Sequence, residues 1–213
     1  MVIDEAHLVT SWGRDFRVDY WFLGDYLEKV RRGSYFSSKK DLSMFPVLCL
    51  TATAVLGGRD DIIEDLQRSM HLDCSSEHLY IGYVCRDNIR FLINNPKERR
   101  SNYKKEEKNL YTIDRIGEFL KHNEKSIIYF PYVSQIDELF TLLKADHPEW
   151  MARIEKYSGS GMSSLGKNDS YTKFRNSQSL IMLATKAFGM GVNITDIRNV
   201  YHFAPTGTLA DYI

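Results

Sequence analysis

At 213 residues, the chain is long enough for one large domain or two small ones. Hydrophobic residues make up 43% of it and charged residues 26%, a balance that excludes a disordered or fibrous protein. The 28 basic and 28 acidic side chains cancel, so any site for nucleic acid must be local and not a property of the whole chain.

The three cysteines, Cys49, Cys74 and Cys85, show no paired C-x-x-C spacing, which predicts reduced thiols and no structural zinc. No run of about 18 apolar residues is present to span a membrane. The first residues carry an acidic motif where a signal peptide would be basic and then apolar. We therefore expect an intracellular, cytoplasmic protein with no membrane partner.

Short apolar runs alternate with amphipathic stretches, which predicts the α/β class, with buried parallel strands joined by helices. The runs expected to form strands are 1–3, 47–50, 127–130, 180–183 and 200–203. The stretches expected to form helices are 60–70, 113–120 and 133–143. Six basic residues among polar neighbours predict a loop insertion at 94–109, with solvation as the simpler interpretation and DNA contact as the alternative.

Two carboxylates and an imidazole follow the first apolar run, in the sequence D-E-A-H at 4–7. Open α/β sheets bind ligands at the carboxyl ends of their strands, so these side chains have a catalytic placement. Phosphoryl transfer to water needs Mg²⁺ and a group that activates the water, and we expect Asp4 to hold the metal through water and Glu5 to be the base. The alternative is an acidic cap of a helix, which a bare Asp-Glu pair would favour.

Aromatic and basic residues alternate in S-W-G-R-D-F-R at 11–17. Trp12 and Phe16 can stack on bases at about 1–3 kcal/mol per base. Arg14 and Arg17 can pair with phosphate or with a catalytic carboxylate. The alternative is that both aromatic rings belong to the core, although the flanking Gly13 favours a loop.

Small and hydroxyl-bearing residues follow two later apolar runs. The first set is T-A-T-A at 51–54, which by itself is as typical of a helix N-cap as of a functional contact. The second is A-T-K-A-F-G-M-G-V-N at 184–193, where Gly189 and Gly191 allow a ligand to approach the backbone closely. Thr185 and Asn193 supply short polar groups for phosphate or ribose there. An isolated G-x-G usually marks only a turn.

In this order, the segments V-I-D-E-A-H, S-W-G-R-D-F-R, L-T-A-T-A and A-T-K-A-F-G-M-G resemble motifs of the RecQ family of superfamily 2 helicases. R-D-N-I at 86–89 and D-x-R-x-V-x-H at 196–202 are similar to further family elements, so the resemblance covers essentially the whole chain. It implies two partial RecA-like domains, 1–83 and 84–213, with mainly parallel sheets flanked by helices.

The resemblance also implies an ATP-dependent 3′–5′ DNA helicase fragment that couples ATP hydrolysis to translocation on single-stranded DNA and duplex unwinding, with roles in DNA repair and recombination. ATP and Mg²⁺ would be its cofactors, and single-stranded DNA and duplex junctions its partners. Asp4, Glu5 and His7 would be catalytic, and Thr51 and Thr53 would couple the sites. The implied DNA contacts are Trp12, Arg14, Phe16, Arg17 and Thr185, and the implied nucleotide contacts are Gly189, Gly191 and Asn193.

Departures from the family pattern leave two alternatives open, a non-catalytic nucleic-acid-binding module and a superfamily 2 motor that acts on RNA. Arg14 stands where the family usually has His, and Tyr132-Val133 replaces its Ser-Arg. No G-x-x-x-x-G-K-[ST] loop is present, and the family's Q-x-x-G-R-A-G-R segment would begin just past Ile213. The first strand starts at Met1, and the chain stops at Tyr212-Ile213 inside an expected helix start. We therefore expect both ends to be truncated and the chain alone to hydrolyse ATP only at background.

Overall fold

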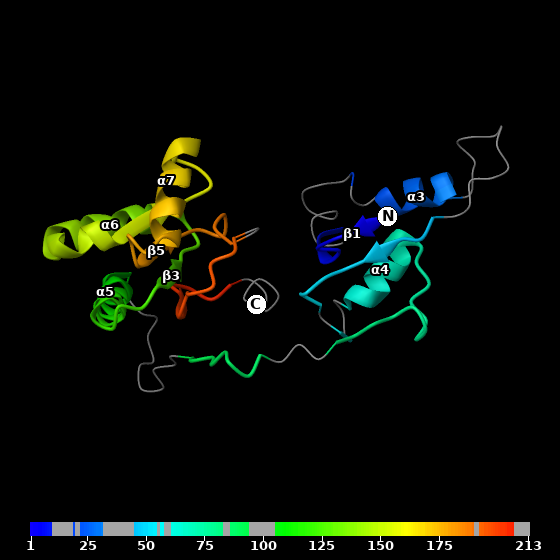
Figure 1. The fold of residues 1–213 in the computed structure, drawn as a ribbon, viewed down its shortest axis with the longest axis horizontal. Helices are drawn as coiled ribbons and strands as arrows, with labels where there is room; N and C mark the ends of the chain where they lie inside the picture. The colour runs from blue at the N-terminus through cyan, green and yellow to red at the C-terminus, as the bar shows by residue number, and fades with distance from the viewer. Residues whose placement is uncertain are drawn as a thin grey trace. The chain divides into compact units, whose positions relative to one another are not determined.

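The computed structural model describes residues 1–9, 19, 22–31, 45–54, 56–57, 61–82, 86–93, 105–189 and 192–206. These residues form two compact units. The described residues up to Ile93 belong to the first unit, and those from 105 to 206 belong to the second (Figure 1). Within the described part of the chain, no helix combines the length and apolar character needed to cross a membrane.

The first unit is built on a parallel pair of short strands, β1 (Val2–Ile3) and β2 (Leu48–Cys49). Two helices, α3 (Leu23–Arg31) and α4 (Ile62–Met70), pack closely, and a Cβ at Gly24 would overlap the backbone carbonyl of Ser69. The helices and strands share one core, made of Ile3, Ala6, Val9, Leu27, Ile62, Leu66 and Met70.

Helix α4 has clear start and stop signals in its sequence. Asp61 is its N-cap, and the Asp61 carboxylate accepts hydrogen bonds from the backbone N–H groups of Ile63 and Glu64 at 2.8 and 3.2 Å. The helix ends at Met70, and its C-cap, His71, has the left-handed conformation with φ of 50°. Ile62, Leu66 and Met70 recur at helical spacing, which places them together on the buried face.

The second unit contains a four-stranded parallel sheet in the order β4-β5-β3-β6. Its strands are β3 (Ser126–Tyr129), β4 (Ile154–Tyr157), β5 (Ile181–Ala184) and β6 (Asn199–His202). Its helices are α5 (Lys105–Lys121), α6 (Val133–Asp146), the 3₁₀ helix η1 (Pro148–Arg153) and α7 (Ser164–Arg175).

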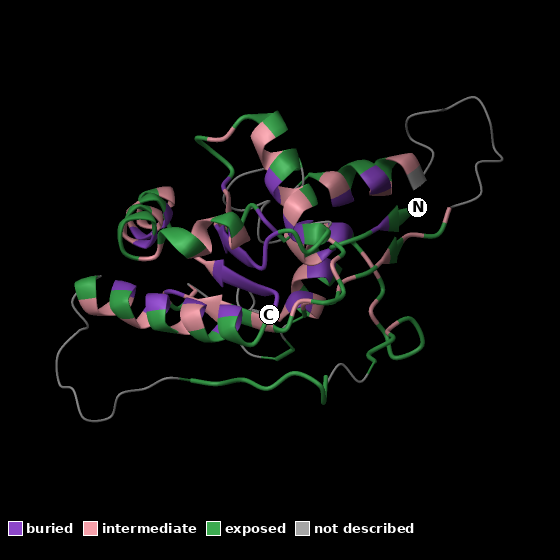
Figure 2. Cartoon of the chain, turned by 60° about the vertical axis from the view of Figure 1, so that its left-hand side comes forward, coloured by how far each residue is buried: buried purple, intermediate pink, exposed green. Residues whose placement is uncertain are grey.

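Each face of this sheet carries an apolar core that packs against helices, as expected for parallel strands. Along β3, Ile128 packs into the core formed with α5 and α6, whereas Ile127 packs into the core formed with Phe174 of α7. Successive side chains of a strand point to opposite faces, so an unbroken apolar run fills both cores. Figure 2 shows the resulting pattern, with buried residues along the strands and along one side of the helices.

The predicted α/β class is confirmed, and each of the five apolar runs contains or overlaps a strand. Strand β4 and helices α3 and α7 were not predicted. The expected loop at 94–109 is wrong for 105–109, which lie in α5. The reason is that this segment has a polar contact to bury: Asn109 is only 3% exposed, and its side-chain amide donates to Glu138 Oε1 at 3.1 Å. Residues 94–104 lie outside the described part of the chain.

Candidate functional site

The residues that follow β1 and β2 meet at the carboxyl ends of these two strands. The two strands are parallel and in register, with Val2 opposite Leu48 and Ile3 opposite Cys49, so their carboxyl ends are adjacent. The backbone ladder continues past the strands, because the Ala6 N–H donates to the Leu50 carbonyl at 2.8 Å. This pairing brings the D-E-A-H segment beside the T-A-T-A segment.

A side-chain hydrogen bond joins these two segments. His7 Nδ1 lies 2.8 Å from Thr51 Oγ1 and 3.4 Å from Glu5 Oε2. The Thr51 hydroxyl donates to the Thr53 carbonyl and accepts from the Thr53 N–H, both at 3.1 Å. Because a hydroxyl has a single proton to donate, this network assigns the donor role toward Thr51 to His7 Nδ1–H.

The carboxylates of Asp4 and Glu5 are exposed at these strand ends. Asp4 Oδ1 accepts from the Glu5 N–H at 2.9 Å. Glu5 has φ of 50°, a conformation that is uncommon outside glycine and clusters at functional sites. Mg²⁺ is usually held by one or two carboxylates together with waters and substrate phosphates, so this pair of residues fits such an ion.

Among the residues the structure describes, no group of three or more His, Cys, Asp or Glu side chains is arranged to hold a metal. Cys49 and Cys74 are free thiols, and burial raises the pKa of the Cys49 thiol. Cys85 and the expected DNA contacts Trp12, Arg14, Phe16 and Arg17 lie outside the described residues.

In the second unit, the residues after β5 form a fixed turn. The Thr185 N–H donates to the Tyr157 carbonyl at 3.1 Å, which extends the pairing of β5 with β4. Phe188 is buried against the ring of Tyr157, with 4.9 Å between the ring centroids. Tyr129, at the end of β3, donates from its hydroxyl to the Phe188 carbonyl at 2.7 Å.

The expected nucleotide contacts lie at the end of this turn and just beyond it. Gly189 has φ of 153°, and a Cβ there would lie 3.3 Å from Tyr129 Oη, so glycine fits on both counts. Asn193 is exposed. Gly191 lies outside the described residues. Thr185 is partly exposed at the same sheet edge as Gly189, so the structure keeps these two expected site residues together.

Further residues that were not predicted from the sequence lie beside this turn. A Cβ at Gly159 would lie 3.3 Å from the Ala187 side chain, so the segment after β4 runs next to the segment after β5. Ser163 is the N-cap of α7, and Lys167 Nζ donates to the Gly159 carbonyl at 2.6 Å. The sequence signal was the Gly- and Ser-rich stretch at 158–163, which only gains meaning once β4 is recognised.

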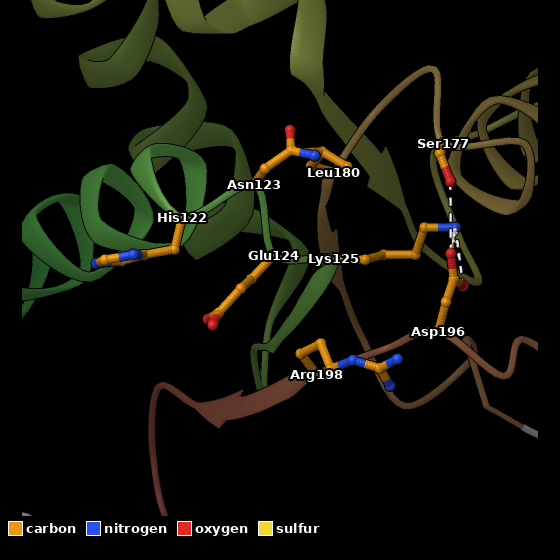
Figure 3. Close-up of a pocket in the computed structure, with 8 residues that line it drawn as sticks. All are labelled: His122, Asn123, Glu124, Lys125, Ser177, Leu180, Asp196 and Arg198. Carbon is orange, nitrogen blue, oxygen red and sulfur yellow. Dashed lines mark hydrogen bonds and ion pairs between the residues drawn. The ribbon is translucent and has the colours of Figure 1, made fainter.

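A cavity of about 410 Å³ lies at the amino-terminal ends of strands β3, β5 and β6 (Figure 3). Its most buried charge is Lys125, 3% exposed, whose ammonium contacts Asp196 Oδ1 and Oδ2 at 2.9 and 2.8 Å and the Arg175 carbonyl at 3.1 Å. The hydrogen bond from Lys125 lowers the pKa of Asp196. Arg198 also lines this cavity, whereas His202 is at the opposite end of β6.

Comparisons with known proteins find similarity to helicases in both halves of the chain. Residues 110–213 match the family model of the helicase conserved C-terminal domain. The probable ATP-dependent DNA helicase RecS of Bacillus subtilis is 31% identical over 95% of the chain and 34% of its own length. The ATP-dependent DNA helicase RecQ of Pasteurella multocida is 27% identical over the whole chain and 28% of its own length. The ATP-dependent helicase wrn-1 of Caenorhabditis elegans is 27% identical over the whole chain and 18% of its own length.

The chain therefore spans between 18% and 34% of the lengths of these relatives. Two solved structures cover 99% of it with a TM-score of 0.61. One is the helicase MrfA bound to DNA and AMPPNP, 17% identical over 27% of that chain. The other is S. cerevisiae Dbp5 bound to RNA and ADP BeF3, 16% identical over 47% of that chain. At this identity they show the fold alone, which confirms the predicted RecA-like architecture.

Proposed function

Because the chain belongs to the RecQ-like superfamily 2 helicases, we propose that it is a segment of an ATP-dependent DNA helicase, here termed the parent protein. The parent protein couples ATP hydrolysis to 3′–5′ movement along single-stranded DNA and to the opening of duplex DNA. The observation that carries this proposal is the 2.8 Å contact between His7 and Thr51, which links a carboxylate-bearing strand end to its neighbour.

The first unit contributes the groups for hydrolysis. Glu5 accepts the proton of the attacking water, and its exposed carboxylate leaves room for that water. Asp4 would hold Mg²⁺ through water, and the ion would supply positive charge for the phosphates of ATP. His7 and Thr51, with Thr53 behind them, transmit changes between the two strand ends because their side chains and backbone form one hydrogen-bonded chain.

The second unit contributes contacts to phosphate. Thr185 binds the DNA backbone, and Gly189, Gly191 and Asn193 lie along the nucleotide. The support for this assignment is the fixed turn at 185–189, whose glycine leaves the backbone accessible. Trp12, Arg14, Phe16 and Arg17 are assigned to single-stranded DNA from the sequence alone. We further propose that the two RecA-like domains comprise residues 1–83 and 84–213.

The test is the parent protein's ATPase, measured without nucleic acid, with single-stranded DNA and with RNA. We expect stimulation by DNA, and unwinding of duplexes with a 3′ tail in preference to a 5′ tail. Stimulation by RNA alone would identify a motor that acts on RNA instead. Nucleic-acid binding with no hydrolysis under any of these conditions would identify a non-catalytic binding module.

A further inference from the structure

Tyr129 is the last residue of β3, between Ala184 of β5 and His202 of β6 in the register of the sheet. Its ring packs against the core that contains Phe174 and Phe188, and lies 5.5 Å from the His202 ring. Its hydroxyl donates to the Phe188 carbonyl at 2.7 Å, across 59 residues of sequence. A residue in the centre of the sheet therefore reaches the turn that follows the neighbouring strand.

This hydrogen bond fixes the peptide plane between Phe188 and Gly189. The peptide bond is planar and trans, so a carbonyl held toward Tyr129 directs the Gly189 N–H to the opposite side. The Phe188 ring is 1% exposed and packs edge-on against Tyr157, which anchors the same residue from its side chain. The turn thus has two separate restraints, one apolar and one polar.

The donor in the polar restraint is the Tyr129 hydroxyl. Burial raises the pKa of the Tyr129 phenol, so the hydroxyl keeps its proton throughout the physiological range. The contact is also close enough to exclude a side chain, because a Cβ at Gly189 would lie 3.3 Å from Tyr129 Oη. Tyr129 and Gly189 therefore constrain each other.

We infer that Tyr129 is a positioning residue, whose hydroxyl holds the Phe188–Gly189 peptide in the orientation that receives a phosphate group. The inference rests on the proposed function for the source of that phosphate, which is either the nucleotide or the DNA backbone. Tyr129 touches neither of them. It acts through the backbone of the turn, much as an outer residue orients a ligand-binding group.

The test uses Tyr129→Phe in the parent protein, a change that removes only the hydroxyl. Thr141→Val is the matched control, because it removes one hydroxyl that donates to a backbone carbonyl of α6, Asp137 O at 2.8 Å, on the other side of the sheet. Hydrogen exchange of peptides covering 185–193 should accelerate about tenfold in Tyr129→Phe, as expected for losing one hydrogen bond of a local structure. The control should leave those peptides unchanged.

Kinetics then identify the phosphate. If it belongs to the nucleotide, Tyr129→Phe should raise the KM for ATP by about threefold to tenfold; if it belongs to DNA, the DNA concentration for half-stimulation should rise instead. A merely structural role would lower kcat in proportion to the folded fraction and leave both constants unchanged. Unchanged exchange at 185–193, or unchanged constants despite faster exchange, overturns the inference.

A double-mutant cycle gives a second readout, thermal melting, that does not depend on enzymatic activity. Gly189→Ala in the wild-type background places its Cβ against Tyr129 Oη, and Tyr129→Phe removes that oxygen. The effects of the two changes on thermal melting should therefore be less than additive. Additive effects would show that the two groups are not in contact. If the wild-type parent protein shows no DNA-stimulated ATPase, the proposed function fails, while exchange and melting still decide whether Tyr129 holds the turn.

Discussion

His7 Nδ1 lies 2.8 Å from Thr51 Oγ1, and this contact connects two segments that are 44 residues apart in the chain. The same hydroxyl bonds both backbone groups of Thr53, so Thr51 closes its own turn while it receives the imidazole. Movement of either strand end must therefore change the position of the other. This is the physical basis for assigning the pair to coupling.

Thr51→Val should separate coupling from folding in the parent protein. Valine keeps the shape of threonine but leaves His7 Nδ1 and the Thr53 N–H without this partner, a loss of about 0.5–1.5 kcal/mol per hydrogen bond. We expect DNA-stimulated turnover to fall about tenfold, with the KM for ATP within about threefold of wild type. Thr51→Ser keeps the hydroxyl and should restore the stimulation. Equal rates for the Val and Ser variants in steady-state ATPase assays would contradict the coupling role.

Glu5→Gln should abolish turnover while ATP still binds. The amide keeps the shape of the side chain but cannot take a proton from water, so the chemical step fails and the affinity for ATP stays within a few-fold. The measurements are single-turnover phosphate release and binding of a fluorescent ATP analogue. Glu64→Gln is the matched control, because Glu64 is an exposed carboxylate on α4 that pairs with Arg68. Parallel loss of binding and turnover in Glu5→Gln would assign Glu5 to the metal instead.

The strands that could be predicted from sequence are those buried on both faces. Ile127, Ile128 and their neighbours are apolar in succession because each side of the sheet is covered. Strand β4 could not be recognised in this way, since among the described strands it pairs only with β5 and it has charged residues in its middle. Those charges are satisfied by helices: Glu155 accepts from Ser170 and pairs with Lys173, and Lys156 pairs with Asp137.

For the candidate site, sequence could predict the types of residue and the strand ends that carry them. It could not predict which side chains meet. The bond from His7 to Thr51 depends on the register of β1 with β2, and the bond from Tyr129 to Phe188 depends on the order β5-β3-β6. Tyr129 ends an apolar strand and is surrounded by unremarkable neighbours, so nothing in its local sequence distinguishes it from a core aromatic.

Because Lys125 is buried, removal of its partner Asp196 should destabilise the second unit more than removal of Lys125 itself. Asp196→Ala leaves the ammonium, which is 3% exposed, with the Arg175 carbonyl but without a carboxylate. Lys125→Met removes the buried charge and leaves Asp196, whose side chain is 49% exposed and hydrated by solvent. A buried cation without a carboxylate destabilises the fold more than an exposed carboxylate without a cation. Asp196→Ala should therefore lower the unfolding free energy of the second unit by about 1–3 kcal/mol, and Lys125→Met should lower it by less.

Chemical denaturation, monitored by hydrogen exchange of peptides from β3 and β5, measures which of the two variants is less stable. Ser177→Ala is the matched control, because the contact of the Ser177 hydroxyl with Asp196 is long, at 3.4 Å. Its effect should be close to zero. A larger loss for Lys125→Met than for Asp196→Ala would mean that Lys125 stabilises the fold through its packing over the Phe174 ring, where its ammonium lies 5.4 Å from the centroid.

The position of His202 predicts how the stability of the second unit depends on pH. Burial lowers the pKa of His202 from its ordinary value of 6.5, so the unfolded chain binds this proton more readily than the folded one. The contribution of the neutral His202 side chain to the unfolding free energy is complete above pH 6.5. It is lost as the pH falls from there toward the lower pKa of His202 in the folded state. His202→Gln should therefore flatten the decline in unfolding free energy below pH 6.5. His122→Gln, which removes an exposed histidine of the same unit, is the matched control. Urea denaturation at a series of pH values tests this, and parallel curves for wild type and His202→Gln would show that burial of the imidazole does not govern the acid sensitivity.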